Sequence, residues 1–339
     1  MNTENPAVTI VLEMAAQALV SQALYVAAKL GVADELAEGS LSPAELAQRC
    51  GAEEGALRRV LRSLNTRGVF LEEADGRFRN TPESMLLRGD VAGSLRAMIL
   101  WIGEEPHWSV FGRMLESVRT GKPAWEGVHG RPVFDYLARD NPALGGIFHR
   151  AMTDFSHVAN EAVLNAMDFH GVAVVADVGG GLGHFLEACL QKYPALTGVV
   201  FDRPEVVEAA KGRLEAAGLR GRARTEAGDF FESVPVAADL CVLKHILHDW
   251  NDTDAVRILN NLHRDGCRRL WIIEMVLSGP NEPHFSKTMD LEMLVTAGGR
   301  ERTGEEFRTL FEKAGYDLRS VTATASPLSV LEAVAFRPD

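Results

Sequence analysis

Short apolar segments alternate with helical stretches throughout the second half of the chain, and this alternation is the strongest constraint on the fold. From residue 172 onward the strand-like segments occupy 173–178, 197–201, 238–243 and 268–273. Strands that alternate with helices typically form a parallel sheet covered by helices on both faces. Helices near 285–296 and 303–314 and strands near 316–322 and 328–336 should complete this part. The sequence therefore predicts an α/β fold for the carboxy-terminal half.

A glycine-rich turn follows the first of these strands. The strand ends in the run DVGGGLG, whose alternate glycines are Gly179, Gly181 and Gly183. Glycine lets the backbone turn sharply and lets a ligand approach it closely, beside the free N–H groups at a helix start. His184 stands where a dinucleotide-binding motif would place its last glycine. We therefore expect a ligand-binding loop, but not one for a dinucleotide.

Three aspartates lie near the ends of successive strands. Asp177 precedes the glycine turn, Asp202 ends the second strand, and Asp229 ends a third strand expected between 197–201 and the fourth strand at 238–243. A carboxylate at the second position can accept both ribose hydroxyls, and one at the third can accept an adenine amino group, with Phe230 against the ring. Three carboxylates around one pocket would repel a pyrophosphate but suit an amine and a cationic sulfonium. We therefore predict S-adenosyl-L-methionine as cofactor, with S-adenosyl-L-homocysteine as its product.

Six short runs in this half match one known family in the right order. They are VADVGGGLG, FDRPEV, GDFF, LKHILHDWND, IIE and GGRERT. On these runs the sequence resembles the small-molecule O-methyltransferases of the plant caffeic-acid and bacterial antibiotic-tailoring type. The resemblance implies a Rossmann-like class I methyltransferase domain preceded by a mostly α winged-helix dimerisation domain. It also implies cofactor contacts by Lys244, Trp250 and, from the run FHRAMTDFS, Ser156.

The fourth strand leads into the run KHILHDW, at the edge of the sheet where open α/β proteins bind ligands. The resemblance places a general base at His248, with His245 as a neighbour, and puts Glu274 and Glu301 on either side of the base. A carboxylate that accepts the Nδ1 proton would leave Nε2 free to take a proton from the substrate. We therefore expect His248, Glu274 and Glu301 to be the catalytic residues.

The histidine run has other interpretations. Two histidines and an aspartate within five residues could bind a metal, but they follow a strand and do not share a helix face, so no metal is expected. No serine has glycines at both flanking positions of a G-x-S-x-G elbow, which argues against a serine hydrolase. His248 could also simply cap the helix that begins near Asn251, and Glu274 and Glu301 could be surface carboxylates.

The family takes phenols and related hydroxylated rings, so the resemblance implies an acceptor pocket lined by methionines and aromatic side chains. The candidate substrate-binding residues are Phe148, Met152, Asp290 and Met293. The apolar ones could equally belong to the core. Some relatives keep the fold and cofactor but catalyse hydroxylation or decarboxylation. That alternative stays open, as does a cofactor-responsive DNA-binding regulator.

A long helix that is apolar on nearly every face is predicted over residues 7–30, ending at Gly31. Such a helix must be covered all round in water. We expect the cover to be a second copy of the chain in a homodimer, with burial inside its own domain as the alternative. The longest uncharged stretch, 14–28, is too short to span a bilayer, so no membrane association is expected.

The elements that follow read helix, turn, helix and hairpin, the order of a winged helix. They start at Ser42-Pro43, turn at Gly51, and continue with a helix at 53–66 and strands at 68–72 and 77–80. A winged helix can bind DNA, but residues 1–95 carry nine basic and thirteen acidic side chains. The whole chain has 35 basic and 47 acidic residues. Because nucleic-acid binding needs a surplus of basic residues, it is not expected here.

A helical region connects the two halves. It contains a predicted long helix over 91–120, a Gly- and Pro-rich loop over 121–132 and helices from about 133 to 168. We divide the chain into a dimerisation domain, a connecting segment that contributes to the substrate pocket, and a cofactor-binding methyltransferase domain. Their predicted bounds are 1–100, 101–168 and 169–339.

The four cysteines are widely spaced and form no C-x-x-C pair. This pattern fits free thiols in a reducing compartment. The first residues carry no basic segment ahead of an apolar one, so no secretory signal is expected. The predicted location is the cytoplasm.

Overall fold

The computed structural model describes residues 5–336, apart from the side chains of residues 157 and 158. Internal contacts divide the chain into two units, each made of two segments. The first unit contains Met1–Ser109 and Phe134–Phe155, and the second contains Val110–Val133 and Ser156–Asp339. The predicted division into three consecutive segments stays a prediction.

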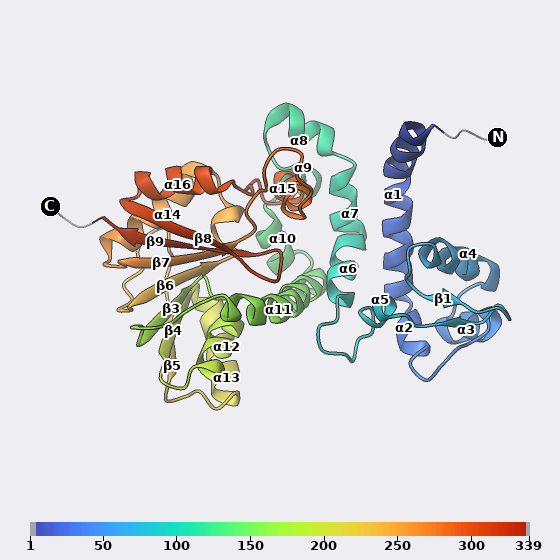
Figure 1. The fold of residues 1–339 in the computed structure, drawn as a ribbon, viewed down its shortest axis with the longest axis horizontal. Coiled ribbons are helices and arrows are strands. Elements are labelled where there is room, and N and C mark those ends of the chain that lie inside the picture. The colour runs from blue at the N-terminus through green and yellow to red at the C-terminus, as the bar shows by residue number, and fades with distance from the viewer. Residues whose placement is uncertain (1–4, 337–339) are drawn as a thin grey trace. The chain divides into compact units, whose positions relative to one another are not determined.

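The first unit is organised around α1 (Pro6–Lys29) (Figure 1). The side chain of Asn5 accepts the N–H of Ala7, and Gly31, with a φ of 69°, follows the helix end. These features confirm the predicted helix and its terminating glycine. The carboxy-terminal half of α1 packs on α4 (Glu54–Asn65) and α6 (Arg96–Gly103). The large apolar side chains nearer its start are more than half exposed, namely Val8, Ile10, Val11, Leu12, Met14 and Leu19.

The winged helix follows α1 in the predicted order. Its elements are α2 (Val32–Glu35), α3 (Pro43–Cys50), α4, β1 (Leu71–Glu72), β2 (Phe78–Arg79) and α5 (Pro82–Met85). Ser42 and Glu45 form a capping box that starts α3, and β1 pairs antiparallel with β2. The hairpin strands are shorter than predicted. The core of this unit includes Leu46, Leu61, Leu64, Phe70 and Phe78, all at most 1% exposed.

The predicted long helix over 91–120 is wrong. The chain forms α6, α7 (Glu105–Phe111) and α8 (Met114–Thr120) instead. The backbone of Glu104 is extended, and Pro106 cannot donate a backbone hydrogen bond, so the helix breaks between α6 and α7. Gly112 marks the second break.

The predicted loop over 121–132 is also partly wrong, because it contains α9 (Ala124–His129). Pro123 stands at its N-cap, and Gly130, with a φ of 78°, follows its end. These residues bound a short helix and do not mark an irregular loop. The helices α10 (Val133–Arg139) and α11 (Pro142–Asn165) agree with the prediction for 133–168.

The second unit contains a seven-stranded sheet with the strand order β5-β4-β3-β6-β7-β9-β8 (Figure 1). The five strands from β5 to β7 are parallel, and β9 is antiparallel to both neighbours. The bounds are β3 Val174–Val178, β4 Thr197–Asp202, β5 Ala223–Ala227, β6 Leu240–Lys244, β7 Arg269–Glu274, β8 Tyr316–Ala323 and β9 Ser329–Ala335. The predicted strands of this sheet are confirmed to within about two residues.

Helices cover both faces of this sheet, as the alternation of side chains along each strand requires. Val199 and Phe201 of β4 belong to a core shared with α14 (Asp252–Arg264) and α16 (Gly304–Lys313). Gly198 and Val200 face the other way, toward Leu186 of α12 (His184–Lys192) and the turn before it. Of the other helices in this unit, α13 (Pro204–Ala216) contacts β4 and β5, and α15 (Ser286–Val295) contacts α8 and α9.

The strand order reverses direction at β3, which lies between β4 and β6. Ligands bind open α/β sheets at the carboxyl ends of the strands beside such a switch point. The glycine turn follows β3, and the run from Lys244 to Trp250 follows β6. The topology therefore brings the two predicted halves of the site to one edge.

By length and composition alone, α1 could cross a membrane, and no part of its most apolar window is buried within the chain. The full helix has 24 residues and is longer than its uncharged stretch, so the short stretch does not exclude a bilayer. A helix near the start of a chain that pairs with another subunit meets the same criteria.

The crossing of α1 and α6 depends on a glycine. A Cβ on Gly103 would lie 2.3 Å from the ring of Tyr25, so replacing Gly103 by Ala should force the helices apart. We expect a loss of about 1–3 kcal/mol and a clear fall in Tm, measured by thermal denaturation. The matched control is Gly127→Ala in α9, where a Cβ meets nothing within 4 Å and should leave Tm unchanged or raised. Equal Tm values for the two variants would contradict this packing.

Candidate functional site

The glycine turn after β3 adopts the left-handed backbone that favours glycine. The φ angles of Gly179, Gly181 and Gly183 are 71°, 56° and 78°. A Cβ on Gly179 would lie 2.4 Å from Cδ1 of Ile246, in the loop after β6. The two loops therefore touch at the switch point, and Gly179 leaves no room for a larger residue.

The three predicted aspartates near this turn differ in their burial and in their hydrogen-bond partners. Asp177 is 1% exposed, and burial raises the pKa of its carboxyl to about 7, although the nearby Lys244 opposes this. Asp202 accepts the backbone N–H groups of Gly181 and Arg203 at 2.8 and 2.7 Å, and burial raises its pKa. Asp229 is exposed and accepts the N–H of Phe231 at 2.8 Å.

Lys244 and Ser156 meet near the buried aspartate. The ammonium of Lys244 donates to the hydroxyl of Ser156 at 2.9 Å. Burial lowers the pKa of Lys244 to about 8, and the charge of Asp177 opposes this shift. The structure thus brings together Asp177, Lys244 and Ser156, which sequence reasoning assigned to one ligand from three separate segments.

Trp250 joins the aromatic residues that follow β5. Its ring meets Phe231 edge-on with the centroids 4.6 Å apart, and Phe230 lies 6.2 Å from it. These rings offer an apolar surface next to the acceptor oxygens of Asp229.

The residues beside the glycine turn fit the polar groups of S-adenosylmethionine. One carboxylate oxygen of Asp177 is buried and has no hydrogen-bond partner among the described residues. It lies beneath the turn, where a Cβ on Gly180 would come within 2.7 Å of it. An unsatisfied buried acceptor, two more carboxylates and an aromatic surface match the amine, ribose and adenine of this ligand.

The loop after β6 begins with a strained residue. His245 has a φ of 55°, which is uncommon for a residue with a side chain, and its N–H continues the ladder to Ile273 of β7 at 3.1 Å. The 3₁₀ turn Leu247–Asp249 follows and carries His248. The rings of His245 and His248 are 5.2 Å apart, and burial lowers the pKa of His245 well below its usual value.

His248 lies among three carboxylates. Its Nδ1 is 3.0 Å from Oε1 of Glu301, and its Nε2 is 3.7 Å from Oδ1 of Asp249. Burial opposes protonation, but the charges of Asp249, Glu301 and Glu274 together raise the pKa of His248 to about 10. About 12% of the side chain is exposed, so the ring keeps some access from outside.

Glu274 contacts His248 through the backbone of the loop. It is fully buried at the end of β7, and its Oε1 accepts the backbone N–H groups of Ile246 and His248 at 3.2 and 3.1 Å. Burial, together with the charge of Glu301, raises its pKa to about 7, while the charges of His248 and Arg302 oppose this. Glu274 therefore binds the backbone of His248, whereas Glu301 binds its ring.

Sequence reasoning did not assign a role to several groups around His248. Asp249 follows His248 in the run KHILHDW, so this run already pointed to Asp249 as a neighbour of the imidazole. In the segment 298–302, the sequence pointed only to Glu301. Within it, the N–H of Arg300 donates to the carbonyl of His248 at 2.8 Å, and a Cβ on Gly299 would lie 1.9 Å from that oxygen.

The predicted substrate-binding residues fall into two sets. Phe148 and Met152 lie on α11 in the first unit, where the ring of Phe148 meets Trp101 edge-on at 5.0 Å. Asp290 and Met293 lie on α15 in the second unit, and Met293 is 8% exposed. Oδ1 of Asp290 accepts the N–H of Glu301 at 2.9 Å. This oxygen is thus engaged within the chain, and the contact of Asp290 with a substrate stays a prediction.

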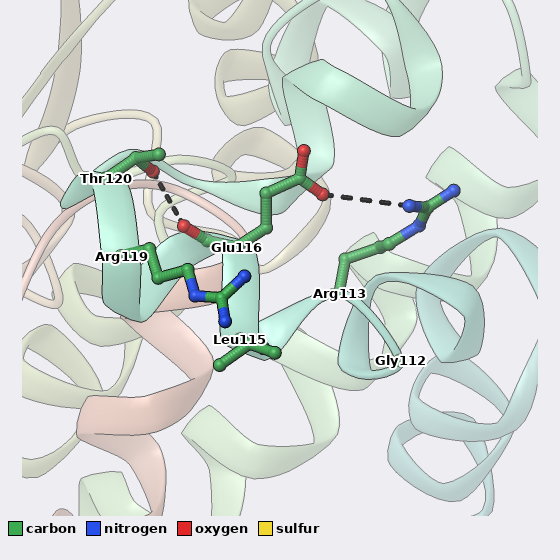
Figure 2. Close-up of a pocket in the computed structure, with 6 residues that line it drawn as sticks. All are labelled: Gly112, Arg113, Leu115, Glu116, Arg119 and Thr120. Carbon is green, nitrogen blue, oxygen red and sulfur yellow. Dashed lines mark hydrogen bonds and ion pairs between the residues drawn. The ribbon is translucent and has the colours of Figure 1, made fainter.

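A surface hollow of about 370 Å³ lies along α8 (Figure 2). Its lining residues are Gly112, Arg113, Leu115, Glu116, Arg119 and Thr120. Arg113 and Glu116 form an ion pair across it at 3.8 Å. None of the predicted site residues lines it. Nor do the described residues contain a group of three or more His, Cys, Asp or Glu side chains arranged to bind a metal.

The contact between Glu301 and His248 can be tested directly. Replacing Glu301 by Gln removes a negative charge 3.0 Å from Nδ1 and should lower the pKa of His248 by about one to three pH units. NMR titration of the imidazole gives this pKa. The control Glu305→Gln changes an exposed carboxylate on α16 and should leave the titration unchanged. If both variants titrate like the parent protein, Glu301 does not set the basicity of His248.

Comparison with known proteins gives consistent matches across the whole chain. An O-methyltransferase domain model matches residues 111–317, and an O-methyltransferase dimerisation domain model matches residues 12–89. Phenazine O-methyltransferase PhzM of Lysobacter antibioticus is 41% identical over 330 residues, with 97% of this chain and 96% of that protein covered. Aclacinomycin 10-hydroxylase RdmB of Streptomyces purpurascens is 37% identical over 311 residues, with 90% and 83% covered.

Among solved structures, CalO1, a methyltransferase in calicheamicin biosynthesis in its SAH-bound form, superposes with a TM-score of 0.89. It is 37% identical, and 99% of this chain and 100% of that chain are covered.

Proposed function

The chain belongs to the O-methyltransferase family and uses S-adenosyl-L-methionine as methyl donor, and from this premise we propose that it methylates a phenolic hydroxyl of an aromatic secondary metabolite. The observation that carries the proposal is the imidazole of His248, held by Glu301 at Nδ1, at the same sheet edge as the glycine turn and its aspartates.

The residues around the glycine turn would hold the cofactor. Asp202 would bind the ribose, Asp229 and Phe230 the adenine, and Asp177, Lys244 and Ser156 the methionine end. When bound, S-adenosylmethionine supplies an electrophilic methyl group and a positive sulfur, and this charge favours both a neutral imidazole and an anionic phenol nearby.

In this proposal His248 takes the phenolic proton on Nε2. A phenol has a pKa of about 10, so an ordinary histidine of pKa about 6.5 would accept its proton at a cost of about 5 kcal/mol. The raised pKa of His248, about 10, removes most of this mismatch. The same shift leaves only about one imidazole in a thousand neutral at pH 7 in the absence of ligands. Turnover at limiting substrate should therefore rise as the pH is raised toward 10.

Replacing His248 by Ala should reduce the rate of methyl transfer by about 10²–10⁴, the usual contribution of a general base. The variant should still bind S-adenosylhomocysteine in calorimetry, because none of the proposed cofactor residues is changed. His170→Ala alters an exposed histidine and serves as the control. Near-full turnover of the His248 variant would remove this residue from the role.

The acceptor class can be identified with labelled S-adenosylmethionine and a panel of phenazines, hydroxylated aromatic polyketides and simple phenols. Transfer of label to a phenolic oxygen supports the proposal. The similarity to a 10-hydroxylase favours one alternative, a hydroxylated product. Mass spectrometry distinguishes the two, because one product gains a methyl group and the other an oxygen atom.

We further propose that the enzyme is a homodimer that pairs through the exposed part of α1. A dimerisation domain model covers residues 12–89, and the exposed apolar side chains of α1 need a cover in water. A second copy of the chain supplies that cover without a membrane, and nucleic acid is not needed for it. The four cysteines are free thiols, in keeping with the proposed cytoplasmic location.

Charges on the exposed side of α1 should dissociate the dimer. The double variant Val11→Glu with Leu19→Glu changes side chains that are 65% and 76% exposed, so the subunit itself should still fold. Light scattering should show a monomer for this variant and a dimer for the control Val321→Glu, which changes an exposed residue of β8. A monomeric parent protein, or one that floats with lipid vesicles, would contradict the proposed partner.

A further inference from the structure

Arg302 is a fully buried arginine behind the loop that carries His248. Its side chain is 0% exposed. Nη1 donates to the carbonyl of Leu247 at 2.9 Å, and Nη2 donates to the carbonyl of Trp250 at 2.7 Å. These two carbonyls flank the base, so the guanidinium spans the 3₁₀ turn from one side to the other.

Asp252 holds the opposite side of the guanidinium. Its Oδ1 accepts hydrogen bonds from Nε of Arg302 at 3.0 Å and from Nη2 at 2.9 Å. Asp252 begins α14, and its side chain is 51% exposed. The ion pair fixes the plane of the guanidinium, which a lysine ammonium could not reproduce because it lacks the planar fork.

Arg302 and Glu274 bind the same turn through opposite groups. The carboxylate of Glu274 accepts N–H groups of the turn, at Ile246 and His248, while the guanidinium of Arg302 donates to its carbonyls. One charged side chain thus satisfies the donors and the other the acceptors. The base is carried on a turn whose backbone both side chains hold.

The covalent neighbour of Arg302 is the partner of the imidazole. Glu301 binds Nδ1 of His248, and Arg302 immediately follows it in the chain. The position of Arg302 relative to the turn therefore also sets the position of Glu301 relative to the ring.

We propose that Arg302, oriented by Asp252, is a positioning residue that fixes the His248 turn against Glu301 for proton transfer. This inference rests on the proposed function, since it assumes that His248 is the base. Arg302 itself does not touch the reacting atoms, and it acts through the backbone of the turn.

The test uses Arg302→Lys, which keeps the charge but loses the fork, and Asp252→Asn, which keeps the arginine but weakens its anchor. We expect kcat to fall about 10–100-fold in Arg302→Lys, the range for small misplacements of a catalytic group. A smaller fall in the same direction is expected for Asp252→Asn. Affinity for S-adenosylhomocysteine should change much less than kcat in both, and the pKa of His248 measured by NMR should fall as the contact with Glu301 loosens.

Arg264→Lys with Asp265→Asn is the matched control. Arg264 also donates to a backbone carbonyl, that of Glu232 at 2.7 Å, and also pairs with an aspartate, but at the far end of α14. This control should keep its kcat and the pKa of His248.

The inference is wrong if Arg302→Lys keeps the kcat and the His248 titration of the parent protein. If Arg302→Lys does not fold, Asp252→Asn decides, because its side chain is half exposed, and parent-like values in that variant overturn the inference. His248→Ala is assayed in parallel. Full turnover of that variant refutes the general base, whereas the His248 titration of the other variants still reports on Arg302.

Discussion

Electrostatic compensation around one imidazole is the interaction on which the candidate site depends. Asp249, Glu274 and Glu301 lie close enough to His248 for their charges to raise its pKa to about 10. Carboxylates buried together repel one another and lose hydration, and each effect favours their protonated forms. The imidazolium and the guanidinium of Arg302 supply the positive charge that offsets this cost. The buried carboxylates and the two cations of this site therefore stabilise one another's charged forms.

The parallel pairing of the strands accounts for this arrangement. Glu274 ends β7 and His248 follows β6, and these strands are parallel neighbours in register. Parallel pairing aligns their carboxyl ends, so a carboxylate in one strand reaches the backbone that follows the other. On the other side of β6, the pairing of β3 with β6 places Asp177 near Lys244 in the same way. His248 and the proposed cofactor residues are thus brought together by the same parallel pairing of strands.

Much of this architecture could be predicted from the sequence, because apolar strands and glycine turns leave strong local signals. The strands of the sheet, the capped helix at Ser42 and the glycine after α1 all follow from short-range chemistry. The sequence held only part of the information about the predicted helix over 91–120. Pro106 and Gly112 are local signals for its breaks, whereas the close contact of Gly103 with Tyr25 joins residues that are distant in sequence and has no local signal.

In the candidate site, too, the sequence predicted some features and not others. The sequence identified the residues that the structure gathers at the carboxyl edge, but it did not reveal which atoms they bind. Glu274 binds backbone N–H groups, which have no sequence signature, and Asp290 binds the N–H of Glu301. Arg302 was overlooked because a buried arginine cannot be told from a surface one before its tertiary partners are known. The sequence therefore did not show which backbone groups these three side chains bind.

The hydrogen bond from the N–H of Glu301 to Asp290 has a consequence for the evolution of this enzyme. Asp290 lies on α15, a helix that packs against α8 and α9 and that also carries Met293. Substitutions that shift α15 would also move the backbone of Glu301 and, with it, the carboxylate beside the imidazole of His248. The placement of this helix and the proton affinity of His248 are therefore coupled, so a lineage that moves α15 also changes the basicity of the imidazole.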